Sequence, residues 1–367
     1  MALNELHVHH FRNITHQKLQ FASGLNLIHG ANGSGKTSLL EAIYYLSTAR
    51  SFRSSNHRRV VQEGERSLTL FGRVSDPQKG LIRIGLEREP GHPRGVKLQR
   101  DGEAIQAVSD LARVLPVSVI EPGTFELVAG GPGHRRRFLD WLVFHVEHWF
   151  SKVWQEAQRA LKQRNHLLRR GIIDAASIGP WNIRVADLGE RLNEGRKAGF
   201  DAFYQEFEAI KARSSVAWLE TVSLSFNPGW DASQDLVSVL EGNLESESRA
   251  GFSLYGPNRA DIRIRVGKQP AGEVLSRGQQ RSLVVLMKLA QMRVLQGKGF
   301  QGICLLDDIH AELDAQNQAL LTSELLALQT QVFLTGIRAP NEGVLGSLML
   351  EHEPSVFHVE HGWFTEQ

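Results

Sequence analysis

The stretch GANGSGKT, Gly30 to Thr37, fits the spacing G-x-x-x-x-G-K-[ST] at every fixed position. Such a loop needs glycines so that its backbone N–H groups can turn inward around phosphate oxygens without obstruction by side chains. Lys36 would supply a positive charge to the β- and γ-phosphates, and the Thr37 hydroxyl would bind Mg²⁺. The residues of this predicted phosphate-binding loop are Gly30, Ala31, Asn32, Gly33, Ser34, Gly35, Lys36, Thr37 and Ser38.

The elements that must position this loop are also readable. LNLIH, 25–29, has the composition of a short buried strand, and Leu39, Leu40, Ile43 and Leu46 recur at helical spacing after the loop. A helix that begins at the loop directs its positive end at a bound anion. The alternative is a glycine-rich turn between a strand and a helix that binds nothing.

A second candidate is the stretch GICLLDDIHAELD, 302–314. The apolar run 303–306 predicts a buried strand that ends in two carboxylates. Asp307 suits Mg²⁺, which prefers hard oxygen ligands, and Asp308 could polarise an attacking water. The alternative is a strand that ends in an ordinary acidic turn.

A third candidate, LSRGQQR, precedes a long apolar helix. Ser276 can cap that helix, and Gly278 leaves backbone N–H groups accessible to an anion. The four residues assigned to this motif are Ser276, Arg277, Gly278 and Gln279. By itself the motif could be a plain helix N-cap.

Composition restricts the class of protein. The 367 residues are 41% hydrophobic with a net charge of +2, so any basic site must be a local patch. The single cysteine, Cys304, excludes an internal disulfide and favours a reducing compartment. No targeting segment or apolar run of membrane-spanning length is present in the sequence, and the histidines lack zinc-ligand spacing. We therefore expect a cytoplasmic protein without a membrane segment.

The texture of the chain predicts two lobes. Residues 1–112 and 272–367 alternate strands and helices around the candidate loop, and Asp101-Gly102 is a type I′ hairpin signal. Residues 113–271 are predicted to form a second, largely helical lobe. One of its helices would bury a face that includes Trp154 and end at Arg169-Arg170-Gly171.

The three candidate motifs, in this order, resemble those of the ATP-binding-cassette ATPases and, within them, of the SMC and Rad50 heads. The resemblance extends to the RecF family of bacterial DNA replication and repair proteins. The strings that carry it are FRN, GANGSGKTSLLEAI, GGPGHRRRFLDWL, LKQRNHLL, GPNRAD, LSRGQQR and LLDDIHAELD, which span most of the chain. The fold that this implies is an α/β ABC-ATPase head with a P-loop nucleotide-binding lobe and a second, largely helical lobe.

The resemblance implies roles for particular residues. Arg12 and Asn13 would lie near the base and sugar of ATP, and Thr335 would lie near the γ-phosphate. Asp307 would hold Mg²⁺ together with Thr37. Lys36, Asp308 and Thr335 would form the catalytic set, and Asp308 in place of the Glu common in the wider superfamily implies slow turnover.

The resemblance also implies an assembly. ATP would be sandwiched between two subunits, with Lys36 of one facing Ser276 of the other and with the loop AELD, 311–314, crossing the interface. The implied function is ATP-dependent binding of single-stranded DNA, double-stranded DNA or gap junctions in recombinational repair and replication-fork maintenance. The expected partners are RecO and RecR, with which the protein would assist RecA loading and support SOS induction. Its own ATPase activity would be weak, stimulated by DNA, and would act as a switch.

Local charge also indicates DNA. The stretch ARSFRSSNHRR contains Arg50, Arg53, Arg58 and Arg59 interspersed with polar residues, and we predict that these arginines contact phosphates without reading base sequence. HRRR, 134–137, and LKQRNHLLRR, 161–170, are further candidates. Arginines in either stretch could instead form ion pairs within the fold or interact with the carbonyl end of a helix.

Three other classes stay open at this stage. A transporter ATPase subunit would need a membrane-domain partner and commonly has a second glycine in the signature. A chromosome-organising SMC or Rad50 head would need a long coiled coil, for which the 271 residues between Lys36 and Asp307 (307 − 36) leave little room. A P-loop kinase would have no use for LSRGQ.

Overall fold

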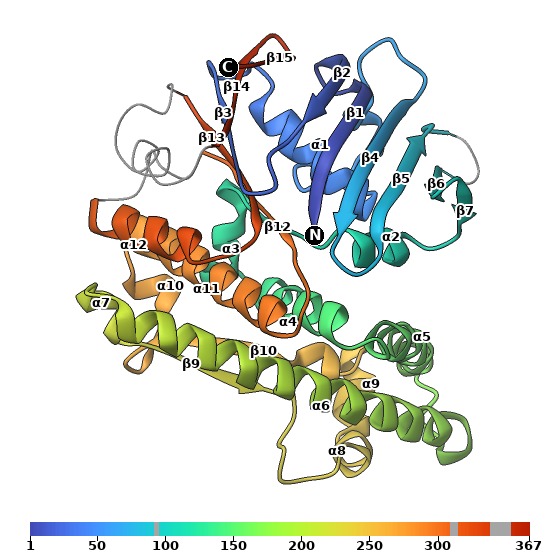
Figure 1. Cartoon of the computed structure of the whole chain (residues 1–367). Coiled ribbons are helices and arrows are strands. Elements are labelled where there is room, and N and C mark those ends of the chain that lie inside the picture. Colours follow the sequence, from blue (N-terminus) through green and yellow to red (C-terminus); the bar gives the residue numbers. More distant parts are fainter. Residues whose placement is uncertain (92–94, 309–314, 338–353) are drawn as a thin grey trace. The chain divides into compact units, whose positions relative to one another are not determined.

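The computed structural model describes residues 1–91, 95–308, 315–337 and 354–367. The chain divides into two compact units, unit 1 (1–124 and 295–367) and unit 2 (125–294). Residues 113–124 therefore fall in unit 1 and residues 272–294 in unit 2, the reverse of the division made from the sequence. Figure 1 shows the elements of both units coloured along the chain.

Unit 1 contains two six-stranded sheets among the described residues. The antiparallel sheet has the order β2-β1-β4-β5-β6-β7 and the mainly parallel sheet has the order β15-β14-β3-β13-β12-β8. The antiparallel strands are β1 (Ala2–Phe11), β2 (Ile14–Gln20), β4 (Leu68–Asp76), β5 (Gly80–Arg88), β6 (Val96–Arg100) and β7 (Glu103–Ile105). The other sheet is built from β3 (Leu25–His29), β8 (Val117–Ile120), β12 (Ile303–Leu306), β13 (Gln331–Gly336), β14 (Ser355–Glu360) and β15 (Trp363–Glu366).

Strands β3, β8, β12 and β13 run parallel to one another. Their carboxyl ends therefore meet at one edge of the sheet, which is where open α/β sheets bind ligands. The register pairs Leu306 with Leu334 and with Ile120. The residues that follow these three strands are consequently neighbours although they lie far apart in the sequence.

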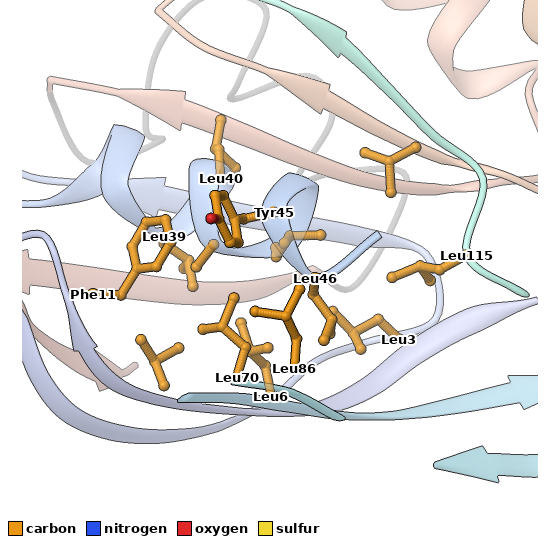
Figure 2. Close-up of a cluster of buried hydrophobic side chains, with 14 of the residues drawn as sticks. Leu3, Leu6, Phe11, Leu39, Leu40, Tyr45, Leu46, Leu70, Leu86 and Leu115 are labelled. Atoms are coloured by element: carbon orange, nitrogen blue, oxygen red, sulfur yellow. The ribbon is translucent and has the colours of Figure 1, made fainter. Parts of the chain in front are cut away.

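Helix α1 (Lys36–Thr48) packs against strands of both sheets. Its leucines, Tyr45 and even Glu41 are buried, as expected for a helix covered on more than one side. Figure 2 shows the leucines and Tyr45 of this helix beside leucines of β1, β4 and β5. The loop before α1 is thus anchored to an extensive apolar cluster of unit 1. Helices α2 (Val108–Val114) and α12 (Ala315–Leu326) complete this unit.

Unit 2 is mainly helical. Its long helices are α4 (Pro132–Val146), α5 (Phe150–Arg169), α6 (Ala175–Arg213) and α11 (Arg277–Gly297). The last of these continues three residues past the boundary at residue 294. Shorter helices are α3 (Glu126–Ala129), α7 (Ala217–Glu220), α8 (Leu236–Gly242), α9 (Leu244–Ala250) and α10 (Ala271–Val274). A small antiparallel sheet has the order β11-β10-β9, from β9 (Val222–Asn227), β10 (Asp261–Val266) and β11 (Gln269–Pro270).

Several local expectations are confirmed. The predicted strands 25–29 and 303–306 are β3 and β12. Asp101 and Gly102 both have positive φ between β6 and β7, as a type I′ turn requires. The expected burial of Trp154 is wrong because the buried stripe of α5 passes through Val153 and Ala157 and leaves Trp154 exposed.

Candidate functional site

The loop between β3 and α1 has the backbone of a phosphate-binding loop. Gly33 and Gly35 adopt φ values of 78° and 124°, a region that favours glycine. Gly30 is also enclosed, because a Cβ there would overlap the carbonyl oxygen of Val359 on β14. Helix α1 begins at Lys36, so its unpaired N–H groups lie at the loop.

The Lys36 ammonium lies inside this loop. Its side chain is buried, and Nζ donates to the carbonyl oxygens of Gly30 at 2.8 Å and Ala31 at 3.1 Å. A buried ammonium requires such acceptors because desolvation of the charge is costly. The positive charge is therefore held where the loop can present it to an anion.

The Asp307 carboxylate receives hydroxyl hydrogen bonds from two other elements. Thr37 of α1 donates to Oδ2 at 2.9 Å, and Thr335 of β13 donates to Oδ1 at 2.9 Å. Asp307 follows β12 directly, and its N–H donates to the carbonyl oxygen of Ile120 on β8. The adjacent strands of the parallel sheet thus bring predicted residues from three segments to one point.

Asp308 adopts a left-handed backbone conformation, with φ 48°. Its N–H donates to the Thr335 hydroxyl at 2.9 Å, and its side chain lines the cleft described below. The conformation turns the chain sharply after β12. The Thr335 hydroxyl lies 3.5 Å from Asp308 Oδ1 as well as 2.9 Å from Asp307 Oδ1, so both carboxylates are near it.

Burial raises the pKa of the Asp307 carboxyl, although the hydrogen bonds from Thr37 and Thr335 act in the opposite direction. Burial also raises the pKa of Glu121, which follows β8, and the nearby negative charge of Asp307 adds to that increase. Glu121 is therefore a further carboxyl beside Asp307 that the sequence interpretation missed. The same rule that located Asp307, a carboxylate directly after a short apolar strand, could have located it.

Arg12 is fixed against α1. Its guanidinium forms a bidentate pair with the fully buried Glu41, at 2.7 and 2.9 Å, and donates to the Arg59 carbonyl oxygen at 2.6 Å. Ser51 donates to the same Glu41 carboxylate. Glu41 was not predicted as a site residue, because nothing in the sequence distinguishes it from an ordinary acidic residue of an amphipathic helix.

The loop is also held from outside by the β14–β15 turn. The carbonyl oxygen of Ser34 accepts hydrogen bonds from Gly362 N at 2.6 Å and from Asn13 Nδ2 at 3.2 Å. Gly362 has φ 80°, and a Cβ at that position would overlap the Asn13 carbonyl oxygen. Gly362 is a positioning residue that no sequence pattern indicated, because the contact joins residues more than 300 apart in sequence (362 − 34).

A cleft of about 1000 Å³ opens over this loop within unit 1. Its lining includes Lys36, Thr37 and Asp308 together with Arg12 and Asn13. That volume reaches the upper end of the range of typical small-molecule sites. Residues predicted for phosphate and base, with Thr37 of the predicted metal pair, thus border one cavity, whereas Asp307 and Thr335 are not part of its lining.

Another part of the cleft lining mixes arginines with three glutamates, Glu63, Glu65 and Glu89. Arg53, Arg58 and Arg59, predicted from sequence to contact DNA, line the cleft together with Arg66. Arg50 is exposed. The structure therefore brings three of the four predicted DNA-contacting arginines to the rim of the phosphate-binding cleft.

Comparisons with known proteins agree with this arrangement. The sequence model of the family described as "RecF/RecN/SMC N terminal domain" matches residues 2–345. The "DNA replication and repair protein RecF" of Marinobacter nauticus is 46% identical over 100% of both chains. That of Cellvibrio japonicus is 41% identical over 99% of this chain and 98% of the relative. This chain belongs to the RecF family.

Solved structures show the same fold. A structure described as the recombination mediator protein RecF-ATP in the RecFOR pathway has a TM-score of 0.85 at 22% identity and covers 100% of this chain and 97% of the other. An Smc head bound to the C-winged helix domain of ScpA has a TM-score of 0.60 at 15% identity, over 100% of this chain and 97% of the other. The expected ABC-ATPase head fold of the RecF family is confirmed.

The predicted signature of this RecF-family chain lies in unit 2, at the start of α11. Ser276 Oγ accepts from Gln279 N at 3.3 Å, and Gln279 Oε1 accepts from Ser276 N at 2.9 Å. This reciprocal pair is a capping box. Ser276 and Arg277 are exposed, so the helix end and its side chains are open to a ligand.

Three other RecF-family strings form internal contacts within unit 2. In HRRR, Arg135 forms a bidentate pair with Asp261 of GPNRAD, and Arg136 donates to the Ala260 carbonyl oxygen. In LKQRNHLL, Arg164 is fully buried against Glu247. These three arginines are therefore committed to intramolecular partners, whereas Arg137 and Arg170 are exposed.

Four further residues of the predicted phosphate-binding loop, Asn32, Gly33, Gly35 and Ser38, line the cleft. The loop AELD, 311–314, lies outside the described residues. No helix in the described ranges has the length and apolar character needed to cross a membrane.

Proposed function

We propose that this chain is an ATP-dependent DNA-binding protein of recombinational repair and replication-fork maintenance. The observation that carries the proposal is the cluster of unit 1 in which Lys36 lies inside the phosphate-binding loop and both Thr37 and Thr335 donate to Asp307. The relatives described as DNA replication and repair proteins support the assignment to DNA repair. The related RecF-ATP structure supports the choice of ATP as the nucleotide.

The residues present fit ATP. Ser34 Oγ at the loop is buried and lacks a hydrogen-bond partner in the described part of the chain, so it can serve a phosphate oxygen. On binding, the Lys36 ammonium would exchange its bonds to two loop carbonyls for the β- and γ-phosphates. Arg12 and Asn13 line the same cleft, where the base and sugar would lie.

The residues also fit Mg²⁺. The Thr37 hydroxyl and the Asp307 carboxylate are hard oxygen donors in hydrogen-bond contact. Magnesium commonly takes only one or two protein oxygens and completes its shell with phosphates and water. Bound Mg²⁺ would neutralise the β- and γ-phosphate oxygens.

Asp308 is the residue that would polarise the attacking water. It borders the cleft, and its backbone is held by Thr335. An aspartate reaches one methylene less far than a glutamate, so we propose slow hydrolysis that works as a release switch. A weak ATPase of this kind would be stimulated by DNA.

ATP would join two copies of the chain. Lys36 and Thr37 of one subunit would face the exposed N-terminus of α11 in the other, where Ser276, Arg277, Gly278 and Gln279 would contact the γ-phosphate. A helix N-terminus with a side-chain hydroxyl is suited to this role. Closure of the dimer would hold single-stranded DNA, double-stranded DNA or a gap junction, with arginines such as Arg50 and Arg53 contacting phosphates.

The proposed partners are RecO and RecR, which would act with this protein to load RecA at gaps and to support SOS induction. The related RecF structure described as part of the RecFOR pathway supports this assignment. The proposed location is the cytoplasm, which the single cysteine favours.

Sedimentation velocity with and without Mg-ATP, each with and without a short gapped duplex, tests the proposal. We expect a monomer that becomes a dimer with ATP and then sediments with the duplex in a salt-sensitive manner. A mass that ATP leaves unchanged, together with a duplex that sediments alone, would contradict it.

The likeness to Smc heads favours one alternative, a head of a chromosome-organising complex. The longest helix in the described residues, α6, has 39 residues and therefore spans about 58 Å. That length suits an arm of unit 2, whereas a chromosome-organising head needs a far longer coiled coil.

A further inference from the structure

An exposed aromatic side chain lies between arginines in unit 2. Phe252 follows α9 and is 44% exposed. The Arg259 guanidinium lies over its ring at 5.1 Å from the centroid, and the Arg169 side chain lies against Gly251, the residue before Phe252. We define Arg169, Phe252 and Arg259 as the Phe252 surface.

The backbone that carries Phe252 is held on both sides. Asn165 of α5 accepts hydrogen bonds from the N–H and hydroxyl of Ser253, at 2.9 and 2.8 Å. Arg259 donates to the Ser253 carbonyl oxygen at 2.8 and 3.1 Å. The Phe252 ring is therefore carried by a segment that is already ordered, which lowers the entropic cost of binding a ligand.

A buried ion pair supports the same segment from below. Arg164 contacts Glu247 at 2.6 Å and donates to the Ser253 hydroxyl at 2.7 Å. Glu247 in turn accepts from the N–H groups of Leu254 and Tyr255. Arg164 and Glu247 are both fully buried. This network therefore holds the Phe252 segment in place, while Arg169 and Arg259 remain exposed to solvent.

The exposed cations of this surface are available to a ligand. Within the described residues, neither Arg169 nor Arg259 forms an ion pair with a carboxylate. Lys162 and His166 lie on the same face of α5 as Arg169, at helical spacing, and are exposed. Proteins that bind a single strand commonly stack its bases on aromatic rings and arginine planes and bind its phosphates with nearby cations. The Phe252 surface has this combination of side chains.

We propose that the Phe252 surface binds single-stranded nucleic acid, with an unpaired base stacked on Phe252 or on the Arg259 guanidinium and with flanking phosphates on Arg169. The site belongs to unit 2 and shares no residue with the unit 1 cleft. It rests on the proposed function, because it specifies which part of the chain engages the single strand.

The test uses the full-length protein and fluorescence anisotropy with a labelled oligothymidine and with a fully paired duplex, in the presence of ATP. Phe252→Ala should weaken binding to the single strand by about tenfold, since stacking on an aromatic residue contributes at this level. Binding to the duplex should change by less than twofold because its bases are not available for stacking. Arg169→Gln should lower the slope of log affinity against log salt by about 0.7.

Matched controls lie on the same helix. Trp154→Ala removes another exposed aromatic of α5, fifteen residues and about 22 Å from Arg169 (169 − 154), and Lys152→Gln removes an exposed cation two residues further away. Both should bind like the parent. Thermal unfolding and ATP binding should be unchanged in all four variants.

The outcomes separate the two proposals. If the parent binds neither oligothymidine nor a gapped duplex, the proposed function fails and this inference fails with it. If the parent binds and Phe252→Ala binds equally well, only the inference about this surface is overturned. Loss of binding to a polyglutamate peptide in Phe252→Ala, with unchanged binding to oligothymidine, would assign the surface to an acidic protein and would also overturn it.

Discussion

The Thr335 hydroxyl donates a hydrogen bond to the Asp307 carboxylate at 2.9 Å, across the adjacent parallel strands β12 and β13. The same hydroxyl accepts from the Asp308 N–H at 2.9 Å. One fully buried side chain therefore orients both acidic residues that follow β12. The roles proposed for Asp307 and Asp308 depend on this threonine.

Thr335→Val should weaken Mg-ATP binding by about tenfold, because a buried carboxylate loses a hydrogen bond that contributes about 1.5 kcal/mol. Thr335→Ser keeps the hydroxyl and should bind nearly as the parent does. Isothermal titration with Mg-ATP measures the difference. Equal affinity of the valine and serine variants would contradict the role of the hydroxyl.

Gly362→Ala should disturb the phosphate-binding loop, although Gly362 lies near the other end of the sequence. The added Cβ would overlap the Asn13 carbonyl oxygen, so the turn that donates to Ser34 must move. We expect loss of ATP affinity of about tenfold or more, together with a lower melting temperature. Titration with ATP and differential scanning calorimetry provide the two readouts.

Gly299→Ala is the matched control for that change. Gly299 has φ 81°, almost the same as Gly362, but a Cβ there meets no atom within 4 Å. It should therefore show only the cost of backbone strain, about 1 kcal/mol of unfolding free energy, and normal ATP affinity. The same loss of ATP affinity in both variants would show that strain, and not the contact with Asn13, is responsible.

Ser276→Arg should prevent ATP-driven dimerisation while the monomer still binds ATP. The large cation would occupy the exposed helix end that we propose contacts the partner's γ-phosphate. Ser276→Ala removes only the cap and should cost about 1 kcal/mol of stability with dimerisation retained in part. Sedimentation velocity distinguishes the two, and normal dimerisation of Ser276→Arg would refute the sandwich.

The stability of the chain should depend on His57 in mildly acidic solution. Burial, with Arg88 and Arg50 adding to it, lowers the pKa of His57 below its ordinary value of about 6.5. As the pH falls below that ordinary value, the unfolded chain takes up a proton that the folded chain resists, so stability decreases. Above it, His57 is neutral in both states and contributes no pH dependence.

His57→Gln should therefore lose less stability than the parent between pH 7.5 and pH values below about 6. Urea unfolding midpoints at several pH values measure the loss. Gln155→Asn, at an exposed position of α5, serves as the control and should follow the parent. An identical pH dependence of all three proteins would exclude His57 as the cause.

Arg164→Ala should destabilise unit 2 strongly. The change leaves the fully buried Glu247 without its cation, and breaking a buried pair in this way costs about 3–5 kcal/mol. Lys162→Ala, two residues earlier on the exposed face of α5, should change stability by less than about 0.5 kcal/mol. Chemical unfolding followed by circular dichroism compares the variants.

The sequence located the phosphate-binding loop, β3, β12 and the Asp307 position because these are local patterns. Glycine spacing, a short apolar run and a carboxylate after it are all set by residues that are adjacent in the chain. The capping box of Ser276 and Gln279 is local for the same reason. The sequence resemblance also identified the family and its fold.

The tertiary structure decided which charges are available and which are committed. Arg135, Arg136 and Arg164 have the same composition signal as Arg53 and Arg58, but the first three bond to groups that other segments bring to them. It also placed Gly362 and Glu121 at the loop and beside Asp307. These relationships arise from strand pairing and burial between distant segments, which one-dimensional spacing does not encode.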